Sequence, residues 1–226
     1  MARFTRIRAL VGADGFERLK NATVMVVGCG AVGSFAIEAL ARTGIGRIII
    51  VDFDTVDISN TNRQLVALTS TLGMRKVDVA AARVRDINPD IDVTAVDTFF
   101  DDNTDFEYRP DFVLDAIDTI DSKIALYRWC RAHDIPFAAS MGAALKTDVA
   151  GLRCGMISKT SVCPLAARVR RRVRDAGLGD FPVVFSTEVP NKSAAAPGRV
   201  FGSIVTVTGT AGLMLANIAI GHILGH

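Results

Sequence analysis

A glycine-rich loop is the first place in this sequence where residue types and spacing predict chemistry. Gly28, Gly30 and Gly33 form the pattern G-x-G-x-x-G between an apolar, β-branched run and a helical stretch. Glycines so spaced allow a tight turn and let a phosphate approach backbone N–H groups at the start of a helix. Asp52 follows 19 residues after Gly33, where a carboxylate can accept hydrogen bonds from ribose hydroxyls. The loop and Asp52 predict a nucleotide site, with NAD, FAD and ATP all left open.

Charged residues further along the chain distinguish these nucleotides. Arg63 lies in the polar run SNTNRQ, Lys76 follows it by thirteen residues, and Asp118 comes just after an apolar run. A dinucleotide carries a pyrophosphate that backbone amides and a helix dipole largely satisfy. ATP brings a further phosphate and a metal ion, so it needs cationic side chains and a carboxylate. The spacing therefore favours ATP.

These side chains require a frame that brings them together. Short apolar runs alternate along the chain with stretches of helical periodicity, which predicts an α/β fold: a Rossmann-like, doubly wound and mostly parallel sheet with helices on both faces. We expect strands at 23–28, 47–52, 92–96, 111–116 and 136–140, and helices at 31–43, 71–88 and 120–133.

Composition excludes several classes of protein. Half of the 226 residues are hydrophobic, which argues against a disordered chain. The four cysteines are scattered and never spaced as C-x-x-C, so neither a disulfide-stapled module nor a zinc ribbon is expected. The opening MARFTRIRAL is interrupted by arginines and does not resemble a signal peptide, which favours a cytoplasmic setting. His133, His222 and His226 lack ligand spacing and are expected to be structural or solvent-exposed.

The near-neutral net charge of +2 hides an asymmetry. Residues 1–150 carry a net charge of −4 and residues 151–226 a net charge of +6. Leu165, Val169 and Val173 recur every four residues and predict a helix with one apolar stripe. We expect its outer face to contact an RNA backbone rather than being only a solvated surface. The basic residues of this face are Arg168, Arg170, Arg171, Arg172 and Arg174.

The C-terminal segment carries no charge from Gly202 onward. Its apolar run, 203–224, is long enough to span a bilayer. It is nevertheless rich in Gly, Thr and Ala and contains Asn217 and His222. We therefore favour a helix buried in the fold or in a dimer interface over a membrane span. Residues 188–198, with two prolines and several small residues, predict a mobile loop.

Several of these motifs together resemble one family. GCGAVGS, VDFDTVDISNTNRQ, DAID and Lys76 resemble the E1-like (ThiF/MoeB/HesA-type) adenylating enzymes over nearly the whole chain. The resemblance is strongest to the branch that dehydrates threonylcarbamoyladenosine in tRNA. The motifs shared with that branch are ARTGIG, TNRQ, INP, DAID, PLAA, VFSTE and VTGT.

The resemblance implies a fold, ligands and roles for individual residues. The fold would be a single E1-like adenylation domain over 1–226, with 1–150 binding ATP and 151–226 facing the substrate and a second subunit. Asp118 would bind magnesium, and Arg6 would reach into the partner subunit's site. Both residues would be catalytic, together with Arg63 and Lys76. The residues implied to contact ATP are Gly28, Gly30, Gly33, Asp52, Asp54, Asn60, Arg63 and Lys76.

The implied reaction is an ATP-dependent cyclisation through an acyl-adenylate. Relatives that transfer an acyl group to a thiol carry a cysteine in the segment matching 185–197, and this chain has none there. An intramolecular ring closure needs no such cysteine. The alternatives are an adenylyltransferase for a ubiquitin-like sulfur carrier, an NAD-dependent oxidoreductase, and a non-catalytic nucleotide-binding adaptor. Modified tRNA and a second copy of the chain are the expected partners, and a sulfur-transfer protein partner is left open.

Overall fold

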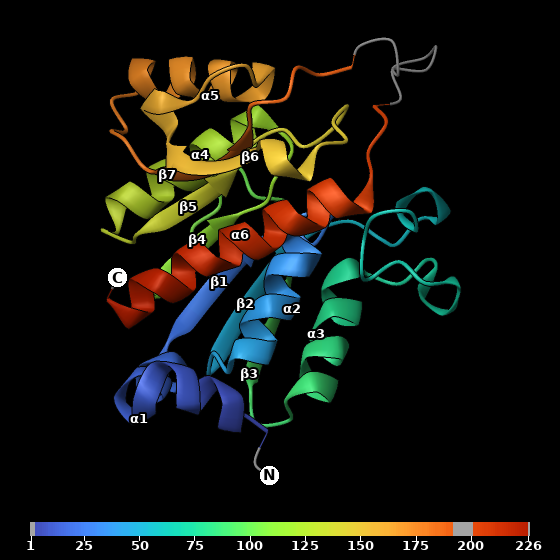
Figure 1. The fold of residues 1–226 in the computed structure, drawn as a ribbon, viewed down its shortest axis with the longest axis vertical. Coiled ribbons are helices and arrows are strands. Elements are labelled where there is room, and N and C mark those ends of the chain that lie inside the picture. The colour runs from blue at the N-terminus through green and yellow to red at the C-terminus, as the bar shows by residue number, and fades with distance from the viewer. Residues whose placement is uncertain (1–2, 192–200, 226) are drawn as a thin grey trace.

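The computed structural model describes residues 3–191 and 201–225, and within them one seven-stranded sheet lies between two layers of helices (Figure 1). The strand order is β3-β2-β1-β4-β5-β7-β6, and neighbouring strands run parallel except β6, which pairs antiparallel with β7 at the edge of the described sheet. The strands are β1 (Thr23–Val27), β2 (Arg47–Asp52), β3 (Asp92–Asp97), β4 (Phe112–Asp115), β5 (Phe137–Ser140), β6 (Leu152–Met156) and β7 (Pro182–Ser186).

The helices divide between the two faces of the sheet. One layer holds α2 and α3 with the long α6 lying across the sheet beside α2, and α1 packs against α6 (Figure 1). The other layer holds α4 and α5. Their bounds are α1 (Thr5–Asn21, with a non-helical break at Gly12), α2 (Gly33–Thr43), α3 (Lys76–Ile87), α4 (Ile120–Ala132), α5 (Pro164–Asp175) and α6 (Val205–Leu224).

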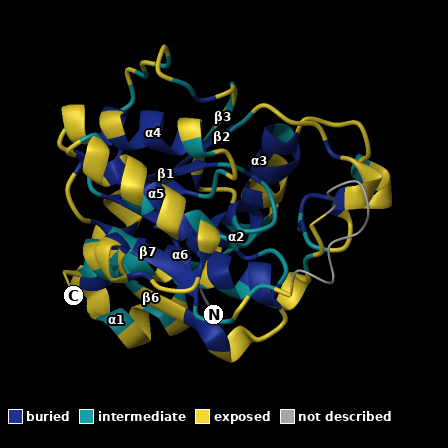
Figure 2. Ribbon diagram, turned by 90° about the horizontal axis from the view of Figure 1, so that it is seen from above, coloured by how far each residue is buried: buried dark blue, intermediate teal, exposed yellow. Residues whose placement is uncertain are grey.

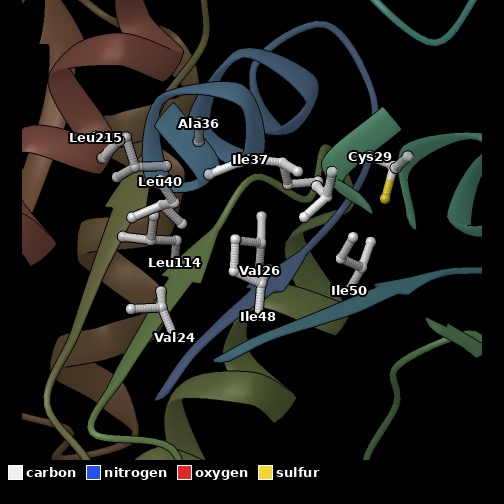
Figure 3. Packing of buried hydrophobic residues seen from close by; sticks show 14 of the residues in the cluster. Val24, Val26, Cys29, Ala36, Ile37, Leu40, Ile48, Ile50, Leu114 and Leu215 are labelled. Atoms are coloured by element: carbon white, nitrogen blue, oxygen red, sulfur yellow. The ribbon is translucent and has the colours of Figure 1, made fainter. Parts of the chain in front are cut away.

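Side chains that point alternately to the two faces of the central strands build a hydrophobic core on each side of the sheet. Val24 and Val26 of β1 face α2 and α6, where they meet Leu40 and Leu215 (Figure 3). Met25 of β1 and its neighbours on the same face pack beneath α4 and α5. Successive side chains of a strand point to opposite faces, so a strand buried on both sides must be apolar throughout. This explains why TVMVV and RIIIVD read as continuous apolar runs.

The predicted α/β fold is confirmed, and the differences have local causes. The helix expected at 71–88 begins at Lys76, because residues 69–71 form a separate 3-10 turn and Gly73 adopts a φ of +80°. The helix α1 and the strands β6 and β7 were not predicted. Gly15 and Leu19 are the buried residues of α1, which leaves only a short apolar signal in its sequence.

The uncharged C-terminal segment forms α6, which by length and composition alone could cross a membrane. Here one side of it packs closely on α2. A Cβ atom added at Gly212 would lie 2.2 Å from the Val32 carbonyl oxygen, and one at Gly209 would lie 2.9 Å from the Phe35 ring. The small residues therefore allow close helix packing, as expected for a helix buried within the fold. Leu213, on another side, remains 48% exposed. The predicted loop at 188–198 lies mostly outside the described residues, as does His226.

Candidate nucleotide-binding site

A pocket of about 1030 Å³ opens at the carboxyl ends of β1, β2, β4 and β5. The chain visits β2 and β3 on one side of β1 before returning to β4 and β5 on the other. Ligands bind at such switch points because the loops that follow the strands diverge there. We call the side built by the loops after β1 and β2 and by α3 the nucleotide wall. The side built by residues 140–146 and the start of α5 is the substrate wall.

Glycines shape the nucleotide wall for two different reasons. Gly28 has a φ of +99°, and a Cβ there would lie 2.7 Å from the Ala116 carbonyl oxygen; one at Gly33 would lie 1.7 Å from the Gly28 carbonyl oxygen. The turn itself therefore requires glycine at both positions. A Cβ at Gly30 would meet nothing closer than the Gln64 amide nitrogen, at 3.8 Å. That open space beside the backbone is what an approaching phosphate needs, so the loop fits ATP.

Asp52 joins the end of β2 to the glycine loop. Its Oδ2 accepts a hydrogen bond from the Cys29 N–H at 2.6 Å, and its Oδ1 accepts one from the Asp54 N–H at 2.8 Å. Burial raises the pKa of Asp52 above its ordinary value, and the two N–H donors oppose that shift. An ionised carboxylate offers about four acceptor positions, so ribose hydroxyls can still bind here.

Lys76 and Asp54 form an ion pair in the pocket. The Lys76 ammonium lies 2.7 Å from Asp54 Oδ2, and the lysine side chain is only 6% exposed. Lys76 is the first residue of α3, and its backbone N–H also donates to the Asp54 carbonyl. Both predicted ligands thus line the pocket, with Asp54 holding the lysine in place.

Arg63 and Asn60 are fixed by the 3-10 turn at Ile58–Asn60. Arg63 Nη1 donates to the Ser59 carbonyl at 2.8 Å and to Asn62 Oδ1 at 2.9 Å. Asn60 is buried, and its side-chain oxygen accepts from the Asp57 N–H at 3.2 Å. Both residues line the pocket, and Arg63 retains further donors for phosphate oxygens.

Asp118 is exposed at the pocket, after the end of β4. The described residues contain no group of three or more His, Cys, Asp or Glu side chains able to hold a metal ion by themselves. Mg²⁺ usually binds one or two carboxylates together with substrate phosphates and water. A single carboxylate beside ATP therefore fits magnesium, with Asp118 as the residue that would hold it.

Beneath the pocket lies a polar group that was not predicted from the sequence. Asp115 and Lys123 are both fully buried and 2.8 Å apart. Lys123 also donates to the Ser140 carbonyl at 2.8 Å, and the Tyr127 hydroxyl donates to Asp115. The group ties the end of β4 to the end of β5. The sequence feature that could have revealed this group is Asp115, a charged residue within a predicted buried strand, because a buried charge requires a buried partner.

Two further residues of the substrate wall were also missed. Lys146 is 2% exposed, and its ammonium donates to the Gly142 carbonyl at 2.9 Å. The buried Cys163 thiol lies 3.9 Å from the same carbonyl oxygen. Burial lowers the pKa of Lys146, and the nearby Cys163 and Glu188 oppose that shift. No spacing in the sequence connects these residues, because their contacts depend on the loop after β5.

The arginine helix forms as expected, but its arginines differ. Arg168 lines the pocket, whereas Arg171 and Arg174 are exposed. Figure 2 shows that one side of α5 is largely exposed. Arg170 is half-buried and donates to the carbonyl and the hydroxyl of Thr160, so it does not belong to the outer face. Arg172 lies 2.9 Å from Asp121 of α4. The periodicity of the helix did not predict that partner, which lies 51 residues earlier in the chain.

Arg6 is exposed on α1, and it does not line the pocket of its own chain. Because α1 leads into the start of β1, it lies toward the opposite end of the sheet from the pocket. A role for Arg6 in catalysis therefore requires a second subunit.

The switch-point pocket, the glycine loop and the paired Lys76 define a Rossmann-type nucleotide-binding protein suited to ATP. The chain matches the ThiF family over residues 4–226 and belongs to that family. It is 50% identical over 191 residues to the tRNA threonylcarbamoyladenosine dehydratase of Bacillus subtilis, covering 83% of this chain and 75% of that protein. Its identity to the Escherichia coli protein of the same name is 37%, covering 98% and 92%.

A solved structure agrees with these relatives. The crystal structure of the E. coli tRNA N6-threonylcarbamoyladenosine dehydratase, TcdA, in complex with ATP matches with a TM-score of 0.91 and 38% identity. The match covers 98% of this chain and 93% of that one. The expected E1-like fold is therefore confirmed.

Proposed function

We propose that this chain is an ATP-dependent enzyme that dehydrates threonylcarbamoyladenosine in tRNA. The observation that carries the proposal is the pocket itself. Its nucleotide wall fits ATP at Gly30, and its substrate wall is continuous with the start of the arginine helix through Arg168. The relatives that match most of the chain carry the dehydratase name, and one of them binds ATP.

The first step activates the carboxylate of the threonylcarbamoyl group. One of its oxygens attacks the α-phosphorus of ATP, and the bond from that phosphorus to the pyrophosphate breaks. Negative charge accumulates on the phosphates in the transition state, where preorganised cations stabilise it most. Lys76 and Arg63 supply those cations, each already held by contacts within the chain. Magnesium bound at Asp118 would add further neutralisation of this charge.

The second step closes a ring. A nucleophile of the same threonylcarbamoyl group attacks the activated carbonyl and expels AMP, so the nucleoside loses the elements of one water. Because this attack is intramolecular, proximity accelerates it and no protein nucleophile is needed. The absence of a cysteine at 185–197 agrees with this route.

We further propose how the rest of the chain contributes. Residues 1–150 bind the nucleotide, and 151–226 face tRNA and a second subunit within a single domain. The exposed arginines Arg168, Arg171, Arg172 and Arg174 contact tRNA phosphates, and Arg6 completes the site of the partner in a homodimer. The unpaired cysteines agree with a cytoplasmic location.

The test is incubation with Mg-ATP and tRNA carrying threonylcarbamoyladenosine, followed by mass spectrometry of the nucleosides. The expected result is the loss of one water from that nucleoside and the release of AMP. Retention of the nucleoside under conditions where ATP binds would refute the proposal. Pyrophosphate release only with a small protein ending in Gly-Gly would support the sulfur-carrier alternative instead. Stabilisation by NAD and not by Mg-ATP would support an oxidoreductase, and ATP binding without consumption an adaptor.

A further inference from the structure

Among the described residues, the buried lysines Lys76 and Lys146 line the pocket and the buried Lys123 lies beneath it, and they differ in what neutralises them. Lys76 pairs with Asp54 at 2.7 Å and Lys123 pairs with Asp115 at 2.8 Å. Lys146 has no carboxylate within 4 Å in the part of the chain that the structure describes; its ammonium donates to the Gly142 carbonyl and lies beside the Cys163 thiol. A buried charge without a counter-charge is costly, which makes this lysine unusual.

Glu188, the carboxylate whose charge raises the pKa of Lys146, is already engaged elsewhere. Glu188 accepts hydrogen bonds from the Thr147 N–H at 3.0 Å and from the Asp148 N–H at 2.8 Å. Those contacts fix the loop that carries Lys146 while leaving its ammonium unpaired. An ammonium has three donors, and one of them is taken by Gly142. The Cys163 thiol also lies beside the ammonium, which leaves one donor for a ligand in the pocket that Lys146 lines.

The start of α5 adds positive potential at the same wall. The Cys163 side chain, just before the helix, accepts no capping hydrogen bond from the first-turn N–H groups; Pro164 is the first helical residue, and no acidic residue lies in the first turn. The N-terminal N–H groups and the helix dipole therefore favour an anion there. Arg168, one turn further along, lines the pocket as well.

The backbone around this wall is strained. Leu145 and Val162 adopt φ values of +61° and +63°, and they directly precede Lys146 and Cys163. They account for two of the three non-glycine residues with positive φ in the described chain. Positive φ is especially unfavourable for a β-branched residue such as valine, and such strain concentrates at functional sites. The residues that directly follow them, Lys146 and Cys163, have side chains that meet at the Gly142 carbonyl.

We propose that Lys146 and the N-terminus of α5 form a subsite that binds the carboxylate of the acyl substrate and presents it to ATP on the nucleotide wall. This inference rests on the proposed function and names the residue that recognises the reacting group. The strand order places the two sites side by side, because the Lys146 loop follows β5 and the glycine loop follows β1, with β4 between them. The substrate carboxylate supplies the counter-charge that the chain itself does not give Lys146.

The experiment compares Lys146→Met with the wild type on two tRNAs, with and without the threonylcarbamoyl group. Hydrogen bonds to charged groups imply that kcat/KM for the modified tRNA falls about 10- to 150-fold. ATP affinity, measured by calorimetry, stays unchanged. The decisive readout is discrimination: the wild type binds modified tRNA more tightly than unmodified tRNA, and Lys146→Met binds both equally. Lys146→Arg recovers part of the preference, because it restores the charge.

A matched control is Lys20→Met, at an exposed position on α1, which leaves both readouts at wild-type values. If Lys146→Met fails to bind ATP, Lys146→Gln provides the same comparison with a polar replacement. A Lys146→Met or Lys146→Gln variant that binds ATP and keeps both the wild-type discrimination and kcat/KM would overturn the subsite. The proposed function would survive that result, because it fails only if the wild type leaves the nucleoside unchanged.

Discussion

The two walls of the pocket hold their cations in different ways. On the nucleotide wall Lys76 is paired with Asp54, and Arg63 is fixed by the turn beside it. On the substrate wall Lys146 and Arg168 have no carboxylate partner within 4 Å in the described chain. The nucleotide wall is therefore organised before ATP binds, whereas the substrate wall is completed electrostatically by its ligand. This difference suits an enzyme that binds a common nucleotide and a specific anionic substrate.

The largest expected effect is on the free energy of unfolding, which should fall more when the ion-paired Lys123 is replaced than when Lys146 is. Lys123→Met leaves the fully buried Asp115 without its counter-charge, so the free energy of unfolding should fall by about 3–5 kcal/mol. Lys146→Met leaves no carboxylate unpaired and should lower it by less than half as much. Urea denaturation of the two variants measures the contrast. An equal fall in the free energy of unfolding of both variants would mean that Lys146 also has a buried counter-charge.

Loss of the paired cation on the nucleotide wall should act on chemistry. Lys76→Ala should reduce kcat on the order of 10²- to 10³-fold, because it removes a preorganised cation from the phosphates. The fold should survive, since Asp54 is 47% exposed and water can solvate it once the lysine is gone. Single-turnover rates and thermal melting measure the two effects, with Lys20→Ala as the control. Near-normal turnover would remove Lys76 from the site.

The arginines of α5 should divide into binding and structural residues. Arg171→Ala should weaken tRNA binding several-fold and reduce the slope of log affinity against log salt by about one. Arg172→Ala should have a smaller effect, because Asp121 already neutralises part of that charge. Arg170→Ala should lower the melting temperature instead, since it removes two contacts to Thr160. Filter binding across a salt series, combined with melting curves, distinguishes them. Three identical profiles would contradict this division.

The smallest effect concerns the loop that carries Lys146. The N–H groups of Asp148 and Thr147 hold the pKa of Glu188 below its ordinary value of 4.5. A lowered carboxyl pKa stabilises the fold above the ordinary value, and this contribution is lost as the pH falls through the lowered pKa. Glu188→Gln should therefore reduce stability by roughly 0.5 kcal/mol or less at neutral pH and flatten the acid side of the stability profile. An unchanged acid profile would show that Glu188 does not stabilise the loop.

The features that could be predicted from the sequence are those encoded by residues close together along the chain. The turn of the glycine loop and the central strands were correctly predicted, because a turn, a buried strand and a helix start are encoded within a few neighbouring residues. Asp52 lines the pocket, and its contact with the ribose stays a prediction. The candidate residues Asn60, Arg63, Lys76 and Asp118 do line one pocket, as the parallel strands require. Their individual roles toward ATP and magnesium stay predictions.

The missed features depend on pairs that are distant along the chain. The Arg172–Asp121 pair joins two helices, and Lys146 meets Cys163 only because two separate loops converge on Gly142. Arg170 was assigned to the outer face because periodicity alone could not show that Thr160 lies within its reach. Such contacts are properties of packing, so neither composition nor spacing could reveal them.

In the proposed mechanism, an oxygen of the substrate carboxylate attacks the α-phosphorus of ATP. Modified tRNA whose carboxylate carries oxygen-18 tests it directly, with mass spectrometry of the AMP released in unlabelled water. The mechanism predicts one labelled oxygen in each AMP, transferred when the ring closes. Unlabelled AMP accompanying the dehydrated nucleoside would show that water, and not the carboxylate, attacks ATP, and would rule out the acyl-adenylate.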